Sequence, residues 1–153
     1  MVKEKESVLM IDCLIIGDSI AVGAAMYKQE CRQLAKGGIN SQQWNRKYQY
    51  EPLVADSVLI SLGSNDHKWV KTKQELVKIR HEVRAKRVYW VLPEGNLPAG
   101  GVNIEDVRRM VLEVADRYGD HVIPILHISK DGIHPTGKGY KEIVKEFSDA
   151  DNN

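Results

Sequence analysis

The stretch Ile15–Gly23, with the sequence IIGDSIAVG, decides the fold because it joins an apolar run to a helical pattern. The apolar run, Val8–Ile16, predicts a buried strand that stops at Gly17. Open α/β sheets bind ligands at the carboxyl ends of their strands, and a helix N-terminus offers free backbone N–H groups to an anion. Ser19, at the turn between strand and helix, is therefore a candidate nucleophile, and a simple helix N-cap is the alternative.

Further strands and helices alternate along the chain. Apolar runs predict buried strands at Val54–Leu62, Arg87–Leu92 and His121–Leu126. Such alternation is typical of a parallel sheet that helices cover on both faces. We expect a single domain over residues 1–153 with an α/β fold, a three-layer α/β/α sandwich around a central parallel sheet of about five strands.

The first helices are predicted from apolar spacing and from a capping motif. One helix is expected to run from Ser19 to a point before Gly37, because apolar residues recur at steps of three and four: Ile20, Ala24, Tyr27, Cys31 and Leu34. A capping box, Thr72-x-x-Glu75, predicts the start of the next helix.

The last two helices are predicted from their ends. Asn103 is expected to cap a helix that stops at Gly119. The final helix is expected to span Thr136–Phe147, and the acidic tail after Glu146 to fray.

The composition is that of an ordinary globular domain, with 42% hydrophobic and 28% charged residues. A formal net charge of +1 gives no reason to expect a nucleic-acid partner. Asp12 interrupts the N-terminal apolar run, and cleavage there would remove the strand that holds Ser19, so we expect no signal peptide. No segment is long enough to cross a bilayer. We expect no membrane partner, and a protein that is cytoplasmic or part of a larger assembly such as a phage particle.

No disulfide, metal or cofactor is expected. Cys13 and Cys31 lack C-x-x-C spacing and are expected to pack as small reduced side chains. Four histidines lack the paired spacing of metal ligands: His67, His81, His121 and His127. A metal site is therefore not expected. A nucleotide-binding protein is disfavoured too, because the turn at Gly17–Gly23 matches neither glycine-rich phosphate motif.

Two later polar blocks complete a pattern that begins with Gly17-Asp18-Ser19. Leu62–Asp66 reads LGSND at the end of an apolar run, and Asp131–Thr136 reads DGIHPT before the last helix. With a looser block, Gly37–Ser41 (GGINS), they resemble in order and spacing the sequence blocks of the SGNH hydrolases, also called GDSL esterases. The resemblance covers residues 17 to 136 and implies a flavodoxin-like SGNH hydrolase fold.

These residue types suit acyl transfer through a serine. A serine hydroxyl needs a positioned base, and a neutral imidazole at His134 can take its proton and later return it to a leaving group. Asp131, three residues earlier, can accept the imidazole N–H and hold the useful tautomer. The alternative for both residues is an Asp-Gly turn followed by a helix-capping loop.

The resemblance also implies an oxyanion hole. Its donors would be the backbone N–H groups of Ser19 and Gly38 and the side-chain amide of Asn65. Whether Gly37 or Gly38 supplies the second donor stays open, because that block is the loosest match. For Asn65 the alternative is a turn residue at a strand end.

Four further residues next to these blocks have expected supporting roles. Asp18 and Asp66 are expected to hydrogen-bond nearby backbone and stiffen the loops that carry their neighbours. Trp44 and Trp69 are candidates for the wall of a substrate pocket, with burial in the core as the alternative.

We therefore expect a serine esterase that hydrolyses a carboxylic ester through an acyl-enzyme on Ser19. The favoured substrate is a short acyl group, acetyl, on a carbohydrate. The alternatives are a lysophospholipase or thioesterase, and a non-catalytic carbohydrate-binding module on the same fold. The oligomeric state stays open.

Overall fold

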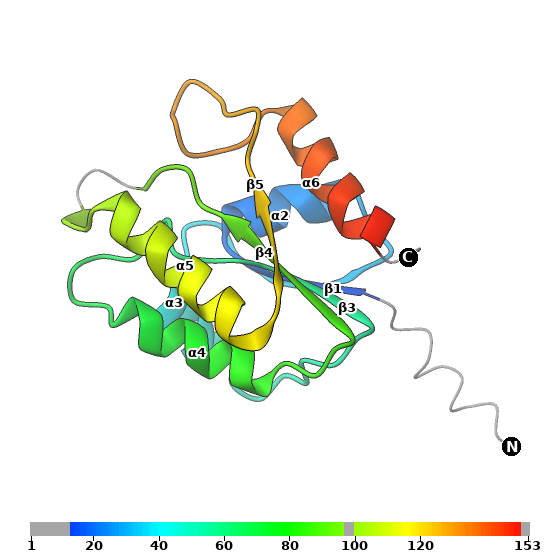
Figure 1. Cartoon of the computed structure of the whole chain (residues 1–153), viewed down its shortest axis with the longest axis horizontal. Coiled ribbons are helices and arrows are strands. Elements are labelled where there is room, and N and C mark those ends of the chain that lie inside the picture. The colour runs from blue at the N-terminus through cyan, green and yellow to red at the C-terminus, as the bar shows by residue number, and fades with distance from the viewer. Residues whose placement is uncertain (1–12, 97–99, 151–153) are drawn as a thin grey trace, which may run out of the picture.

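A parallel five-stranded sheet forms the middle layer of the computed structural model, which describes residues 13–96 and 100–150 (Figure 1). The strand order is β2-β1-β3-β4-β5. This is the order of flavodoxin-like folds, in which a crevice opens at the carboxyl ends of the two strands where the winding reverses, β1 and β3. The strands are β1 (Cys13–Gly17), β2 (Arg32–Ala35), β3 (Ser57–Ser61), β4 (Arg87–Leu92) and β5 (His121–Pro124).

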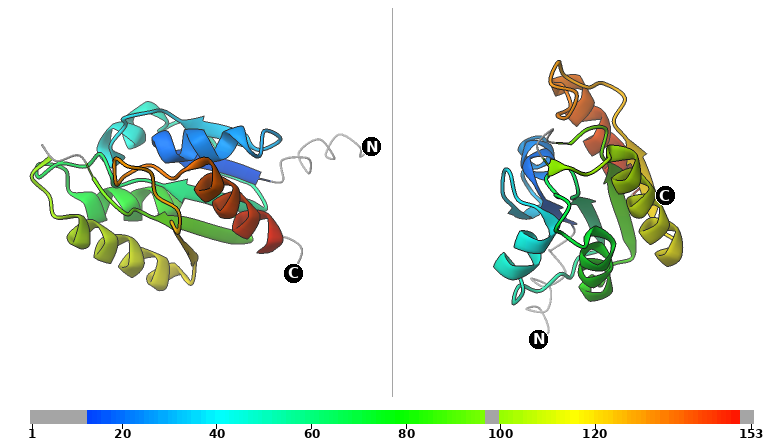
Figure 2. Two further views of the ribbon diagram at one scale, coloured as in Figure 1. Left: turned by 90° about the horizontal axis from the view of Figure 1, so that it is seen from above. Right: turned by 90° about the vertical axis from the view of Figure 1, so that its left-hand side faces the viewer.

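Helices cover both faces of the sheet and make the outer layers (Figure 2). One face carries α2 (Ser19–Met26) and α6 (Gly137–Ala150). The other face carries α3 (Ser41–Lys47), α4 (Thr72–Glu82) and α5 (Ile104–Tyr118). The expected three-layer α/β/α sandwich is confirmed.

The alternation of side chains along each strand divides the core in two. In β1, Leu14 and Ile16 pack toward α3, α4 and α5, while Cys13 and Ile15 pack toward α2 and α6. All five residues of β1 are buried, as expected of a central strand with helices on both faces.

Several predicted elements are confirmed. β4 has the predicted bounds, and α5 has Asn103 as its N-cap and Gly119, in the left-handed conformation, as its C-cap. The strands predicted at Val54–Leu62 and His121–Leu126 are present in shorter form as β3 and β5. Of the strand predicted at Val8–Ile16, the part before Cys13 lies outside the described residues.

The prediction of one long helix from Ser19 to a point before Gly37 is wrong. α2 ends at Met26, and residues that were expected to continue it form the edge strand β2, which pairs in parallel with β1. Cys31 and Leu34 continue the helical spacing by coincidence, and no glycine or proline marks the turn between Tyr27 and Cys31. Pairing with the open edge of β1 satisfies the backbone of this segment, so tertiary context overrides the local pattern.

The predicted capping box at Thr72 was also wrong. The N-cap of α4 is Lys71, without a side-chain capping bond, and the Thr72 hydroxyl donates instead to Asp66 Oδ2 at 2.8 Å. At the other end of the chain, α6 continues to Ala150, so the helix extends beyond the expected start of fraying at Glu146.

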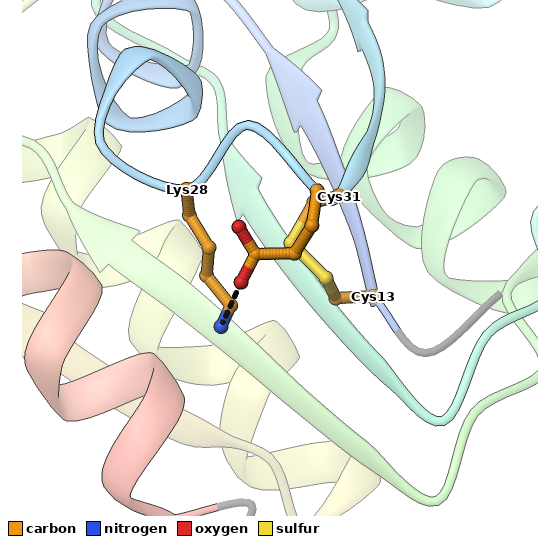
Figure 3. The surroundings of a disulfide bond; sticks show 4 residues. Cys13, Lys28 and Cys31 are labelled. Carbon is orange, nitrogen blue, oxygen red and sulfur yellow. Dashed lines mark hydrogen bonds and ion pairs between the residues drawn. A yellow bond between two sulfur atoms is a disulfide. The ribbon is translucent and has the colours of Figure 1, made fainter. Parts of the chain in front are cut away.

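The expectation of reduced cysteines is overturned. Cys13 and Cys31 form a disulfide that joins the start of β1 to the segment before β2, beside the Lys28–Glu30 ion pair (Figure 3). The pairing register sets Leu14 opposite Arg32, which brings the preceding residues of both strands to a Cα–Cα separation of 4.8 Å. The sequence does not reveal this proximity, because its apolar spacing predicts a helix where β2 forms.

We expect reduction of this disulfide to destabilise the fold. The crosslink closes a loop with a sequence separation of 18 residues, and loop-closure entropy predicts a loss of about 3 kcal/mol in the free energy of unfolding. Urea unfolding with and without dithiothreitol measures the effect. The Cys13→Ala/Cys31→Ala double variant is the control and should not respond to the reductant. An equally stable reduced wild type would contradict the prediction.

Candidate active site

The turn that presents Ser19 depends on a close approach between the ends of β1 and β3. Gly17 has a φ of 140°, and a Cβ atom on it would lie 1.9 Å from the carbonyl oxygen of Ser61. That same carbonyl accepts the backbone N–H of Asp18 at 2.9 Å. Only glycine fits such an approach. The end of β1 is therefore held against the end of β3, and α2 begins directly afterwards at Ser19.

Asp18 caps the helix that begins with Ser19. Its Oδ1 accepts the backbone N–H of Ile20 at 3.0 Å and the hydroxyl of Ser61 at 3.2 Å. Its Oδ2 is buried and has no hydrogen-bond partner among the described residues. Burial raises the pKa of Asp18 to about 7, although hydrogen bonds, those from Ile20 and Ser61 foremost, oppose the rise. The expected hydrogen bond between Asp18 and nearby backbone is present, but the sequence alone did not indicate the raised pKa.

Ser19, His134 and Asp131 form a continuous chain of hydrogen bonds. The Oγ of Ser19 lies 2.9 Å from Nε2 of His134, and Nδ1 of His134 lies 2.6 Å from Oδ2 of Asp131. Ser19 begins α2, whereas the other two residues belong to the loop between β5 and α6. The fold thus brings together groups that are 115 positions apart in the sequence.

Asp131 is held as a carboxylate by its own loop. The hydrogen bond with the His134 ring, joined by bonds from the backbone N–H groups of His134 and Ile133 and from the Ser129 hydroxyl, lowers the pKa of Asp131. An ionised carboxylate only accepts, so Nδ1 of His134 carries the hydrogen. In the neutral ring Nε2 is then the acceptor for the Ser19 hydroxyl, which is the arrangement that a general base needs.

Two contacts fix this loop in place. The backbone N–H of Ser129 donates to the carbonyl of His134 at 2.8 Å, which closes the loop on itself. Gly95, after β4, lies so close that a Cβ on it would be 2.2 Å from the carbonyl oxygen of Gly132. Sequence reasoning missed Gly95, because a close approach between two loops leaves no periodic signal.

The loop after β2 lies beside Ser19. A Cβ on Gly37 would be 3.9 Å from Cβ of Ser19, and Gly38 has a φ of 78° that favours glycine. The backbone N–H groups of both glycines have no hydrogen-bond partner among the described residues. Asn65 reaches this loop from the end of β3, because its Nδ2 donates to the carbonyl of Ile39 at 3.1 Å.

Asp66 ties the loop after β2 to the loop after β3. Its carboxylate accepts the backbone N–H of Ser41 at 2.8 Å, the Ser41 hydroxyl at 2.6 Å and the Thr72 hydroxyl. Burial raises the pKa of Asp66, while these hydrogen bonds oppose the rise because they favour the ionised form. The expected stiffening role is supported by these bonds. The sequence pattern predicts a capping box at Thr72 and so does not reveal the contact with Asp66.

The two tryptophans have different environments. Trp44 is 1% exposed and its Nε1 donates to the carbonyl of Leu34 at 2.9 Å, so it belongs to the core and not to the wall of the active site. Trp69 is 77% exposed and follows the Asn65 block, with Nζ of Lys68 lying 5.2 Å from its ring centre. Only Trp69 is therefore available to a substrate.

Among residues 13–96 and 100–150, no group of three or more His, Cys, Asp or Glu side chains is arranged to hold a metal ion. His127 pairs with Glu142 at 2.7 Å instead. Within the same ranges, no helix has both the length and the apolar character that a membrane crossing requires.

The α/β fold and the hydrogen-bonded Ser-His-Asp chain are those of a serine hydrolase. The family model described as GDSL-like lipase/acylhydrolase matches residues 15–142, and the chain belongs to this family. The match includes Ser19, Asn65, Asp131 and His134.

Solved structures share the fold at low sequence identity. A GDSL-like lipase from Bacteroides thetaiotaomicron VPI-5482 is 16% identical, with a TM-score of 0.72 over 92% of this chain and 87% of that chain. A lipase/acylhydrolase from Enterococcus faecalis is 16% identical, with a TM-score of 0.68 over 91% and 96%. The acetyl xylan esterase AlAXEase is 13% identical, with a TM-score of 0.67 over 90% and 98%. Curated proteins gave no significant match.

We expect Asp18 to make stability fall as pH rises through neutrality. Its pKa is raised from 3.8 to about 7 on folding, so the folded state keeps a proton that the unfolded state releases, and the stabilisation present at low pH is lost as pH approaches about 7. Asp18→Asn keeps the oxygen acceptor without the charge. Between about pH 5 and about pH 8, the wild type should lose about 3 kcal/mol relative to this variant.

Urea unfolding at both pH values provides the measurement. The exposed Asp116→Asn variant is the control and should follow the wild type. Parallel pH profiles for wild type and Asp18→Asn would show that Asp18 does not bind the extra proton.

Proposed function

We propose that the protein is a short-chain carboxylic ester hydrolase that uses Ser19 as nucleophile and removes acetyl groups from a carbohydrate. The observation that carries the proposal is the chain of hydrogen bonds from Ser19 through His134 to Asp131 at the carboxyl edge of the sheet. The geometry suits proton transfer, because the hydroxyl and the imidazole are already within hydrogen-bonding distance.

Acylation begins with attack of Ser19 Oγ on the ester carbonyl carbon. The hydroxyl proton passes to Nε2 of His134 as the Oγ–C bond forms, and Asp131 stabilises the imidazolium. The imidazolium then protonates the leaving alkoxide as the ester C–O bond breaks. This step leaves an acetyl group on Ser19 and a free hydroxyl on the carrier.

Deacylation follows the same steps, with water in place of Ser19 as the nucleophile. His134 takes a proton from water as its oxygen attacks the acyl carbon, and returns that proton to Oγ of Ser19 as the acyl–enzyme bond breaks. Acetic acid leaves, and the enzyme regains its starting protonation state.

The tetrahedral intermediates carry a negative oxygen that needs donors. We assign this role to the backbone N–H groups of Ser19 and Gly38 and to the amide of Asn65. The N–H of Ser19 is at the first position of α2, where helical N–H groups lack partners within the helix. Asn65 has two amide hydrogens, and the bond to Ile39 uses one of them.

The substrate assignment rests on the open setting of the site. The side chains of Asp131 and His134 are 47% and 40% exposed. An open site suits a small acyl group on a large carrier, and the exposed indole of Trp69 offers an apolar face on which a sugar ring can stack.

We expect Asn65→Ala to lower kcat by about 10²- to 10³-fold, because loss of one oxyanion donor has this effect in other serine hydrolases. Its unfolding free energy should stay close to that of the wild type, because the side chain is only part-buried. Aryl acetate kinetics measure kcat, and a fluorophosphonate probe reports covalent capture of Ser19.

The controls separate catalysis from mere binding. Ser19→Ala should abolish labelling, and His134→Ala should slow it strongly because the nucleophile loses its base. A wild-type protein that neither reacts with the probe nor cleaves aryl acetates would be a binding module on the same fold.

The substrate is tested by acetate release from acetylated xylan, acetylated peptidoglycan and acetylated sialic acid, measured beside aryl esters of increasing chain length. Acetyl esters should be preferred. Trp69→Ala should raise KM for the acetylated polymer by about tenfold while leaving kcat on aryl acetate unchanged, because stacking on one aromatic ring contributes roughly 1–2 kcal/mol. A preference for long acyl chains would instead indicate a lysophospholipase or thioesterase.

A further inference from the structure

Gly23 occupies an unfavourable place for a glycine. It lies inside α2, an eight-residue helix whose first residue is Ser19. Glycine in a helix interior is less favourable than alanine, because it loses more backbone freedom on folding. Its φ is not in the left-handed region, so backbone conformation does not require it. The reason for this glycine must lie in what packs against it.

The ring of Tyr140, on the first turns of α6, fills the space that a side chain at position 23 would occupy. A Cβ on Gly23 would lie 2.3 Å from Cζ, 2.4 Å from Cε1 and 2.7 Å from the hydroxyl oxygen of Tyr140. These distances are far inside van der Waals contact. The ring therefore rests directly on the backbone of α2.

Tyr140 is connected to the loop that carries His134. Its backbone N–H donates to the carbonyl of Thr136 at 2.9 Å, in the first turn after that loop. Its ring stacks on Tyr27, with ring centres 6.2 Å apart, and the hydroxyl of Tyr27 approaches Gly137. Burial raises the pKa of Tyr140, and the charges of Asp18 and Asp131 add to the shift, in keeping with a ring between the helix cap and the loop.

We propose that the contact between Gly23 and Tyr140 sets the distance between Ser19 and His134. The two side chains that must exchange a proton belong to separate segments, α2 and the loop before α6, and the Gly23–Tyr140 contact joins these segments about one helical turn from Ser19. Gly23 and Tyr140 would act through the segments that carry Ser19 and His134, and we therefore class them as positioning residues. The inference rests on the proposed role of Ser19 as nucleophile.

Alanine at position 23 tests this directly. To reach ordinary contact the Tyr140 ring must withdraw by about 1 Å, and because the ring also stacks on Tyr27 we expect α6 and the His134 loop to move with it. The Ser19–His134 separation of 2.9 Å would then exceed good hydrogen-bonding distance. A misplacement of about 1 Å can reduce the rate about 100-fold.

The experiment measures kcat and KM on an aryl acetate, the rate of fluorophosphonate labelling and the urea unfolding curve for Gly23→Ala. We expect kcat and the labelling rate to fall about 100-fold, KM to stay within about twofold, and the protein to remain folded. Helix propensity alone predicts the opposite, full activity in a slightly more stable protein. Met26→Ala, on an exposed residue of the same helix, is the matched control and should behave as the wild type.

A double-mutant cycle identifies Tyr140 as the partner. In a Tyr140→Ala background the added methyl group has room, so Gly23→Ala should then change kcat by less than about threefold. Gly23→Ala activity within about threefold of wild type would overturn the proposal, and so would an equal loss in both backgrounds. If instead Ser19→Ala keeps wild-type activity, the proposed function itself fails, which is a separate outcome.

Discussion

The close approach of β1 to β3 at their carboxyl ends is the constraint on which the rest of the site depends. Gly17 permits it, and the Ser61 carbonyl and hydroxyl then hold Asp18 through its backbone and its side chain. Since Asp18 caps α2, the same contacts aim the first residue of that helix at the rim of the sheet. The strand order places the topological switch point at this rim, because the chain winds in opposite directions from β1 and β3.

Two buried carboxyl groups hold the loops at this rim, while an exposed carboxylate is hydrogen-bonded to the imidazole of His134. Asp18 and Asp66 each accept hydrogen bonds from backbone and hydroxyl donors, and burial raises the pKa of both. Asp131 is exposed and its pKa is lowered. Burial causes the rise at Asp18 and Asp66, whereas hydrogen bonds, above all the one with the His134 ring, lower the pKa of Asp131.

Prediction from the sequence succeeded where the signal was local or came in ordered blocks. The strand Arg87–Leu92 and the helix between Asn103 and Gly119 have clear ends and apolar periods, and both are present as predicted. The order of the four polar blocks indicated the family, which the family match confirms. Prediction failed at β2, because an edge strand without punctuating residues continued a helical period by chance. That single error also hid the disulfide between Cys13 and Cys31.

The sequence by itself determined the class of fold, the family and the residue types available for acyl transfer, because apolar periodicity and ordered motifs are properties of the linear chain. Only the tertiary structure decided that Trp44 is core while Trp69 is exposed, that Gly95 supports the Asp131 loop, and that a tyrosine ring rests on Gly23. The physical reason is that burial and close approach arise between segments distant in sequence, and packing fixes them only when the helices close over the sheet.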